Sequence, residues 1–259
     1  MKPTVNNVAS VAIIYPRDDP EQVFLCEYDS GYPAVVFRGM YNPPGGNWIG
    51  PLAASDRGPL DTIRRELKEE LVLGGAPADR LELVSLGLVD QVDPNEKVQG
   101  GTLVNVDPND ARMLGRIRSS IQKALQPWGS YYHLVPKAVF DAVDLMNKRG
   151  PTSTLVCCWL APLGPKTWSH LARLQDKYDN LTNEGNTRIT SLDAIVSGRR
   201  LIAWGHTRGY CDFWVSYGLM RAKDVHRIAV IQSDYVGPIL ETYKEILSRY
   251  NVLRTPFTT

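Results

Sequence analysis

The sequence predicts a mixed α/β fold, because apolar segments of β-strand composition alternate with segments of helical periodicity along its 259 residues. The clearest strands lie at residues 8–15 and 152–160, and the clearest helix lies at residues 61–73. This length suits one large domain with insertions as well as two domains. We adopt a single domain over residues 1–259, in which no internal repeat or low-complexity tract is present.

The chain begins with a predicted β-hairpin. Residues 8–15 and 23–28 are rich in apolar and β-branched side chains, and the turn-forming residues 16–20 separate them. A third short strand is expected within residues 32–41. The run at residues 8–15 is too short to span a bilayer, and only Lys2 and no small-residue cleavage site accompany it. We therefore expect no membrane partner.

Residues 61–73 contain neither Gly nor Pro, begin just after Pro59 and end against Gly74-Gly75, which predicts a helix. One side of this helix repeats apolar residues at helical spacing and would face a core. The residues of this apolar stripe are Ile63, Leu67 and Leu71, joined at the ends by Leu60 and Leu73.

Three carboxylates share a patch beside that stripe. Glu66, Glu69 and Glu70 stand three and four positions apart, so their like charges crowd together and repel. A hard divalent cation with oxygen ligands would remove the repulsion, and Mg²⁺ is the first candidate, with Mn²⁺ as an alternative. The competing interpretation is a solvated acidic face whose partners are neighbouring basic residues such as Arg64 and Arg65.

An upstream pair of glycines favours the cation hypothesis. Gly45 and Gly46 follow two prolines on the loop that leads into the helix, where the missing side chains would let a phosphate approach the backbone. In combination, these residues resemble the Nudix hydrolase family, whose box reads G-x5-E-x7-R-E-U-x-E-E-x-G-U, with U an aliphatic residue. The positions that agree are Gly46, Arg65, Glu66, Leu67, Glu69, Glu70 and Leu73.

The sequence departs from that box in three places. Arg57 occupies the position of the first glutamate, with Asp56 beside it. Arg57 stands eleven residues after Gly46, where the box has six, so the loop carries five extra residues. Val72 takes the place of the second glycine, and Gly74-Gly75 follows shortly after it.

The resemblance implies an α/β/α sandwich, in which a mixed sheet lies between helices and a loop–helix–loop holds the metal. It also implies that Glu66, Glu69 and Glu70 bind one or more divalent ions, while Arg65 holds this acidic cluster in place by ion pairing. A second stretch, residues 183–195, is similar to a loop and strand of the family, where Glu184 would match a further metal ligand or the base. A plain loop glutamate is the equal alternative there.

The activity that the resemblance implies is metal-dependent hydrolysis of a pyrophosphate bond in a nucleoside diphosphate linked to another moiety. A water deprotonated by Glu66 or Glu184 would attack one phosphorus in line, and the partner would be a small-molecule nucleotide. The alternative is a Nudix-fold nucleotide-binding or regulatory module with little or no turnover, which Arg57 and the lengthened loop favour. A third interpretation is an interaction protein whose acidic helix is coincidental.

Residues 90–150, approximately, are expected to form a largely helical insertion or an elaborated sheet connection, with helices at residues 111–125 and 135–148. Between these two helices lies an aromatic group that would form either a base-stacking platform or core packing. Its members are Trp128, Tyr131, Tyr132 and His133. Residues 168–178 are a helix or an ordered loop, and residues 222–259, approximately, are a helical extension. The amphipathic helix in that extension would pack on its own domain or on a second copy, as in a homodimer.

Composition excludes some functions. The 29 Lys and Arg residues nearly balance the 28 Asp and Glu residues, so no global positive field favours binding to nucleic acid. The four cysteines include no C-x-x-C pair, and the adjacent Cys157-Cys158 is a poor disulfide. They are interpreted as buried thiols, which predicts a cytoplasmic location. His206 is interpreted as a packing residue.

Overall fold

The structure is a computed structural model that describes residues 7–28, 37–49, 56–73, 106–134, 153–178, 180–182, 185–203, 206–221 and 223–228. Several predicted features lie outside these ranges. They are the helix expected at residues 135–148, the first half of the segment 32–41, residues 229–259 of the expected helical extension, and Glu184.

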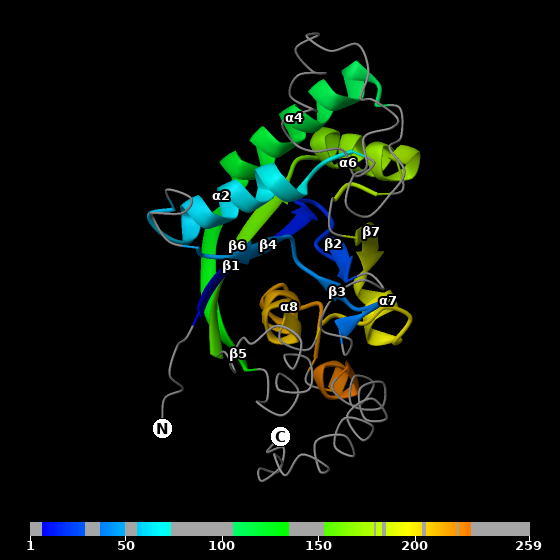
Figure 1. The fold of residues 1–259 in the computed structure, drawn as a ribbon. Coiled ribbons are helices and arrows are strands. Elements are labelled where there is room, and N and C mark those ends of the chain that lie inside the picture. The colour runs from blue at the N-terminus through cyan, green and yellow to red at the C-terminus, as the bar shows by residue number, and fades with distance from the viewer. Residues whose placement is uncertain are drawn as a thin grey trace, which may run out of the picture.

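A mixed sheet occupies the centre of the described part of the chain (Figure 1). Its long central pair is β1 (Asn7–Pro16) and β6 (Ser153–Leu163), which run parallel from Asn7 opposite Thr154 to Pro16 opposite Leu163. The remaining pairings are antiparallel, so the predicted mixed α/β class is confirmed. These other strands are β2 (Gln22–Tyr28), β3 (Tyr41–Asn42), β4 (Gly45–Asn47), β5 (Gln126–Leu134) and β7 (Gly185–Ser191).

Strand β1 is apolar except at Asn7 and Ser10, because both of its faces are buried. Ala12 and Ile14 belong to the hydrophobic core on one side of the sheet, whereas Val11, Ile13 and Tyr15 belong to the core on the other side. A strand that carries helices on both faces needs such a continuous apolar run rather than an alternating one. The segment predicted as a strand from its composition therefore lies at the centre of the fold.

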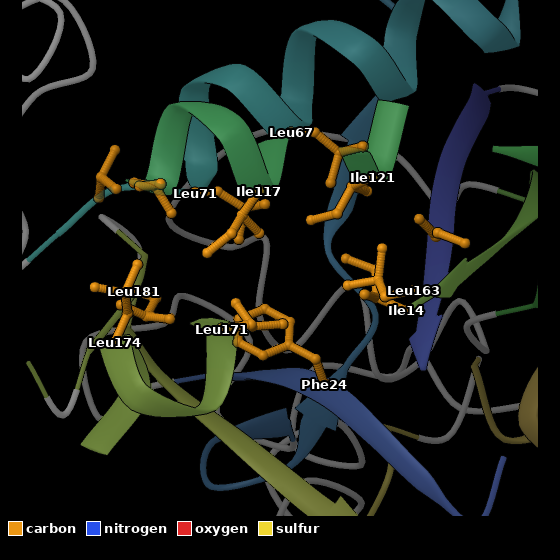
Figure 2. Close-up of a cluster of buried hydrophobic side chains, with 14 of the residues drawn as sticks. Ile14, Phe24, Leu67, Leu71, Ile117, Ile121, Leu163, Leu171, Leu174 and Leu181 are labelled. Carbon is orange, nitrogen blue, oxygen red and sulfur yellow. The ribbon is translucent and has the colours of Figure 1, made fainter. Parts of the chain in front are cut away.

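Three helices cover the first face: α2 (Pro59–Glu70), α4 (Pro108–Ala124) and α6 (Pro165–Tyr178). Figure 2 shows how their apolar side chains meet those of the sheet, with Leu67 of α2 and the following Leu71 close to Ile117 and Ile121 of α4. The predicted apolar stripe is confirmed, since Ile63, Leu67 and Leu71 are fully buried. The helix ends at Glu70 and not at residue 73 as predicted, because Leu71 is extended and bridges to Thr182. The segment predicted as helix or ordered loop at 168–178 is helical.

The second face carries α7 (Leu192–Val196) and α8 (Thr207–Ser216). Their side chains, above all Phe213 and Trp214, pack against the odd-numbered residues of β1 and against β2. His206 is buried here, and its Nδ1 lies 2.9 Å from the hydroxyl of Tyr131, which confirms the packing interpretation. The described elements thus form helix, sheet and helix layers.

Strand β5 was not predicted. It follows directly after α4 and pairs with β6 at the edge of the sheet, so the region expected to be largely helical contributes a strand as well as a helix. Proline lacks an N–H and is tolerated on an edge strand such as this one, next to the irregularity between Pro127 and Gly129. Tyr131 is buried in the core, whereas Trp128 is exposed, so these two side chains do not form one platform.

All four cysteines are free thiols, and Cys26, Cys158 and Cys211 are buried as predicted, whereas Cys157 is only partly buried. Burial raises the pKa of Cys158 to about 12, with a smaller contribution from Cys157, and burial beside Asp212 raises the pKa of Cys211 to about 12. Such thiols stay protonated near neutral pH and are poor nucleophiles. In the described part of the chain, no helix is long and apolar enough to cross a membrane.

Asp110 ties α4 to α6. Its buried carboxylate accepts hydrogen bonds from Arg173 Nη2 at 2.7 Å, Lys177 Nζ at 2.5 Å and the Tyr178 hydroxyl at 3.0 Å. Burial alone would raise the pKa of Asp110, but hydrogen bonds from Lys177 and Tyr178 and the charge of Arg173 hold it below the ordinary value of 3.8. The charged carboxylate therefore stabilises the fold above that value, and the contribution is lost as the pH falls through the lowered pKa.

We expect Asp110→Asn to lower the free energy of unfolding at pH 7 by about 1–3 kcal/mol, since it weakens a buried, charge-assisted network. The gap between wild type and variant should shrink as the pH falls below 3.8. Urea denaturation at a series of pH values measures it, with Asp193→Asn, an exposed carboxylate paired with Arg199, as the control. A gap that stays constant across the series would refute this account.

Candidate active site on helix α2

Helix α2 is fixed to the sheet by its first turn and by its apolar stripe. The Ser10 hydroxyl donates to the Pro59 carbonyl at 2.7 Å and accepts from Trp159 Nε1 at 2.8 Å, which joins the start of α2 to β1 and β6. Proline at the first helical position needs no N–H partner and sets the helical φ. With its apolar stripe buried, the helix presents Arg65, Glu66 and Glu69 on its remaining surface.

Arg65 is the centre of the candidate site. Its Nη1 lies 2.9 Å from Glu66 Oε1 and 2.9 Å from Glu69 Oε2, so one nitrogen holds both carboxylates. Its Nε and Nη2 donate to the Asp56 carboxylate at 3.1 and 3.0 Å, and Nη2 also donates to the Asn47 carbonyl at 3.0 Å. The planar guanidinium thus organises three carboxylates at once.

The charge of Arg65 is secured by these partners. Burial alone would lower its pKa, but the hydrogen bond to Asp56 and the charges of Glu66 and Glu69 together raise the pKa above the ordinary value. The side chain is only 17% exposed. Arg65 is therefore a permanent cation whose donors point at protein oxygens, which fits a positioning role.

Asp56 is the third carboxylate that contacts Arg65. Its side chain is 3% exposed and pairs with Arg65 in a two-nitrogen contact. Arg57, at the expected position of the box glutamate, is exposed, and its backbone N–H donates to Asp61 Oδ2 at 3.2 Å. Asp56, the residue before Arg57, therefore supplies an acidic partner of Arg65.

We expect Asp56→Ala to lower the free energy of unfolding by about 2–3 kcal/mol, because a largely buried guanidinium loses its strongest acceptor. Urea denaturation measures this loss. The control is Asp61→Ala, which removes a carboxylate from the same region whose described contact is the Arg57 N–H, and which should cost less than about 1 kcal/mol. Equal losses in the two variants would show that the Asp56–Arg65 pair contributes no more to stability than the carboxylate of Asp61.

The two glycines lie in strand β4, not in a loop as predicted. Residues Gly45 to Asn47 pair antiparallel with β1, and a Cβ on Gly45 would lie 2.2 Å from the Ser10 carbonyl oxygen. Gly45 also has a φ of +141°, which side chains rarely adopt. A Cβ on Gly46 would lie 2.4 Å from Glu66 Oε1. The glycines therefore make room for β1 and for the Glu66 carboxylate, while the predicted phosphate contact stays a prediction.

Glu70 differs from the other two glutamates. It is buried, and its Oε2 accepts a hydrogen bond of 2.8 Å from the Gly45 N–H. This bond ties the last turn of α2 to β4, so the helix and the glycine strand are held in a fixed relation. The acidic patch predicted on α2 is thus divided, with Glu66 and Glu69 on Arg65 and Glu70 turned toward the sheet.

The donor chemistry of the three glutamates fits a hard divalent ion, since Mg²⁺ prefers carboxylate oxygens. Within the described ranges, no group of three or more His, Cys, Asp or Glu side chains is arranged to hold an ion. The arrangement seen here has Arg65 Nη1 between Glu66 and Glu69. Glu69 is the most exposed of the three glutamates, with 54% of its side chain accessible to solvent.

Glu184 lies outside the described residues, but its neighbours on both sides are described. Thr182 forms an antiparallel bridge with Leu71, and the Val72 N–H donates to the Leu181 carbonyl at 3.0 Å. Strand β7 begins at Gly185. The chain before Glu184 is therefore held against the end of α2.

An open hollow of about 570 Å³ lies beside the first turn of α2, between that helix and strands β5 and β6. Sequence analysis gave no sign of it, because its walls come from three separate stretches of the chain. Its size falls within the range of small-molecule sites. Residues of its lining include Arg57, Pro59, Asp61, Ser130, Cys157 and Trp159.

Comparison with known proteins adds no family to this description. No protein-family model matches the chain, and no curated protein matches it. The resemblance to Nudix hydrolases therefore rests on the motif residues of the sequence alone.

Proposed function

We propose that this chain is a Nudix-type pyrophosphohydrolase with an α/β/α sandwich. It hydrolyses a pyrophosphate bond in a nucleoside diphosphate linked to another moiety. The observation that carries the proposal is the contact of Arg65 with Glu66 and Glu69 while Glu66 lies against Gly46. Residues that agree with the two halves of the family's box thus meet in space, across the loop that separates them in sequence.

Glu66, Glu69 and Glu70 would hold Mg²⁺ or Mn²⁺, which when bound offsets charge on phosphate oxygens and lowers the pKa of a water molecule. The chain's own residues have separate tasks. Arg65 positions Glu66 and Glu69, and its donors are directed at protein oxygens. Glu66, whose side chain is 12% exposed, or Glu184 accepts the proton of the attacking water.

A nucleotide-binding or regulatory module with little turnover is the second candidate. The observation that favours it is the use of Glu70 as an acceptor for the Gly45 N–H, together with Arg57 at the expected glutamate position. Both functions require the same carboxylates and the same nucleotide partner. They differ in turnover alone.

The experiment that separates them measures release of phosphate or nucleotide from three classes of compound. These classes are nucleoside triphosphates, dinucleoside polyphosphates and nucleotide sugars, each assayed with Mg²⁺, with Mn²⁺ and with a chelator. Release from at least one class that stops with the chelator supports the hydrolase. Nucleotide binding without release supports the module, and absence of both binding and release refutes both.

A further inference from the structure

Trp48 is an exposed aromatic residue directly after strand β4. Its side chain is 40% exposed, and the next residue, Ile49, is also exposed. A folded chain gains free energy by burying a side chain as large as tryptophan, so an exposed one next to a candidate site needs an explanation.

The indole ring of Trp48 is held in place although it is exposed. Its Nε1 donates to the Asp56 carbonyl at 3.0 Å, and its backbone N–H donates to the Val8 carbonyl at 2.8 Å. Both ends of the residue are therefore anchored, one to the segment before α2 and one to β1. A flat surface that is already fixed loses little conformational freedom when a ligand covers it.

The position of Trp48 relates it directly to the acidic cluster. Gly46 faces the Glu66 carboxylate, and the next residue, Asn47, accepts a hydrogen bond from Arg65. Trp48 directly follows β4, and its N–H extends the pairing with β1 to Val8, so the alternation of a strand places its side chain on the face where Gly46 meets Glu66. Two residues span about 7 Å along a strand. The ring lies close to the cluster, because its Nε1 donates to the backbone carbonyl of Asp56, whose side chain pairs with Arg65.

We propose that Trp48 stacks on the nucleobase of the nucleotide, while the phosphates extend along β4 toward Glu66, Glu69 and Glu70. The phosphate end of this placement rests on the proposed function, whereas the stacking contact does not. Every nucleobase presents a flat π-face, so stacking on an indole selects planar heteroaromatic ligands without reading base edges. Purines, with the larger ring system, bind more tightly than pyrimidines.

Trp128 is the natural control, because it is a tryptophan of similar exposure in a different place. It is 38% exposed and belongs to β5, which is separated from β4 by β6 and β1. Three strand spacings correspond to about 14 Å, so its ring cannot join the same contact. It also belongs to the aromatic group for which the sequence left base stacking open as an alternative to core packing.

The first test compares Michaelis constants for a cleaved nucleoside triphosphate and for inorganic tripolyphosphate, which has no base. Stacking of a base on an aromatic ring strengthens binding, so Trp48→Ala should raise the KM for the nucleotide about tenfold. Its kcat and its KM for tripolyphosphate should stay within about twofold of wild type. Trp48→Phe, which keeps a ring, should retain most of the affinity, and Trp128→Ala should behave as wild type. A Trp48→Ala variant that changes neither KM, or both equally, overturns the proposal.

The second test needs no turnover and so separates this inference from the proposed function. Adenosine, which lacks phosphates, should quench tryptophan fluorescence in wild type and in Trp128→Phe, but not in Trp48→Phe. Equal quenching in Trp48→Phe and wild type overturns the stacking contact. If no nucleotide is cleaved while the adenosine effect depends on Trp48, the hydrolase proposal fails and the stacking contact stands.

Discussion

Replacing Glu69 and Glu70 by glutamine in one variant is expected to lower metal-dependent turnover by about 10³-fold or more. Two of the three carboxylates proposed to hold the ion would lose their charge, and neutral amides are weak ligands for a hard cation. The fold should persist, because Glu69 is half exposed and a glutamine at position 70 still offers an acceptor to the Gly45 N–H. Turnover and urea denaturation measured on the same preparation test both statements.

The matched control for this variant is Glu21→Gln. Glu21 is an exposed glutamate in the turn between β1 and β2, and its backbone carbonyl accepts a hydrogen bond from the Leu192 N–H. Its replacement removes one exposed carboxylate, as the change at Glu69 does, from a residue outside the candidate site. If the double variant keeps more than about a tenth of wild-type turnover, the assignment of the cation to α2 is wrong.

Gly45→Ala is expected to lower mainly the stability of the fold, whereas Gly46→Ala is expected to lower mainly the turnover. Gly45→Ala would place a Cβ 2.2 Å from Ser10 O and 2.7 Å from Val11 Cα, and neither backbone atom can move without breaking the β1–β4 pairing. Together with the φ of +141°, this should lower the free energy of unfolding by about 3–5 kcal/mol. Chemical denaturation provides the measurement.

In Gly46→Ala, the atoms nearest to the new Cβ belong to the end of a flexible side chain, the Glu66 carboxylate, with Oε1 at 2.4 Å. The carboxylate can move aside, so we expect a loss of stability below about 1 kcal/mol but a fall in turnover of about 10²-fold. Gly129→Ala is the control, since a Cβ there meets nothing within 4 Å. Wild-type turnover in Gly46→Ala would show that the position of Glu66 over this glycine has no functional role.

Periodicity predicted the elements whose side chains point into a core. The stripe of Ile63, Leu67 and Leu71 is buried as expected, and the apolar run at residues 8–15 is the central strand. These features depend on local composition and spacing, which one sequence displays. The helix predicted at residues 111–125 is likewise present as α4.

Features that depend on contacts between distant residues were not predictable. The Gly45-Gly46 segment was expected to be a loop because glycines are rare inside strands, but its partner β1 lies more than thirty residues earlier. Strand β5 was not predicted for two reasons. Residues 135–152 separate it in sequence from its partner β6, and Pro127 and Gly129 are residue types that usually interrupt a strand. Trp48 carried no periodic signal, and its relation to Asp56 exists only in the folded chain.

Asp56 shows the same limit inside the candidate site. Alignment to the family's box placed Arg57 at the glutamate position, and sequence alone left open whether the adjacent aspartate serves instead. The direction of the Asp56 side chain toward Arg65 depends on how the lengthened loop enters α2, which no spacing rule specifies. The sequence thus contained the aspartate that pairs with Arg65, but it did not show that the two side chains would meet.

The measurement that tests the central claim most directly is a calorimetric titration of Mn²⁺ into wild type and into Glu69→Gln/Glu70→Gln. The account predicts that wild type binds Mn²⁺, that Mg²⁺ competes for the same site, and that the affinity of the double variant falls by about 100-fold or more. The Glu21→Gln control should match wild type. Equal Mn²⁺ affinity in wild type and the double variant would contradict the claim that the carboxylates of α2 hold the cation on which the proposed activity depends.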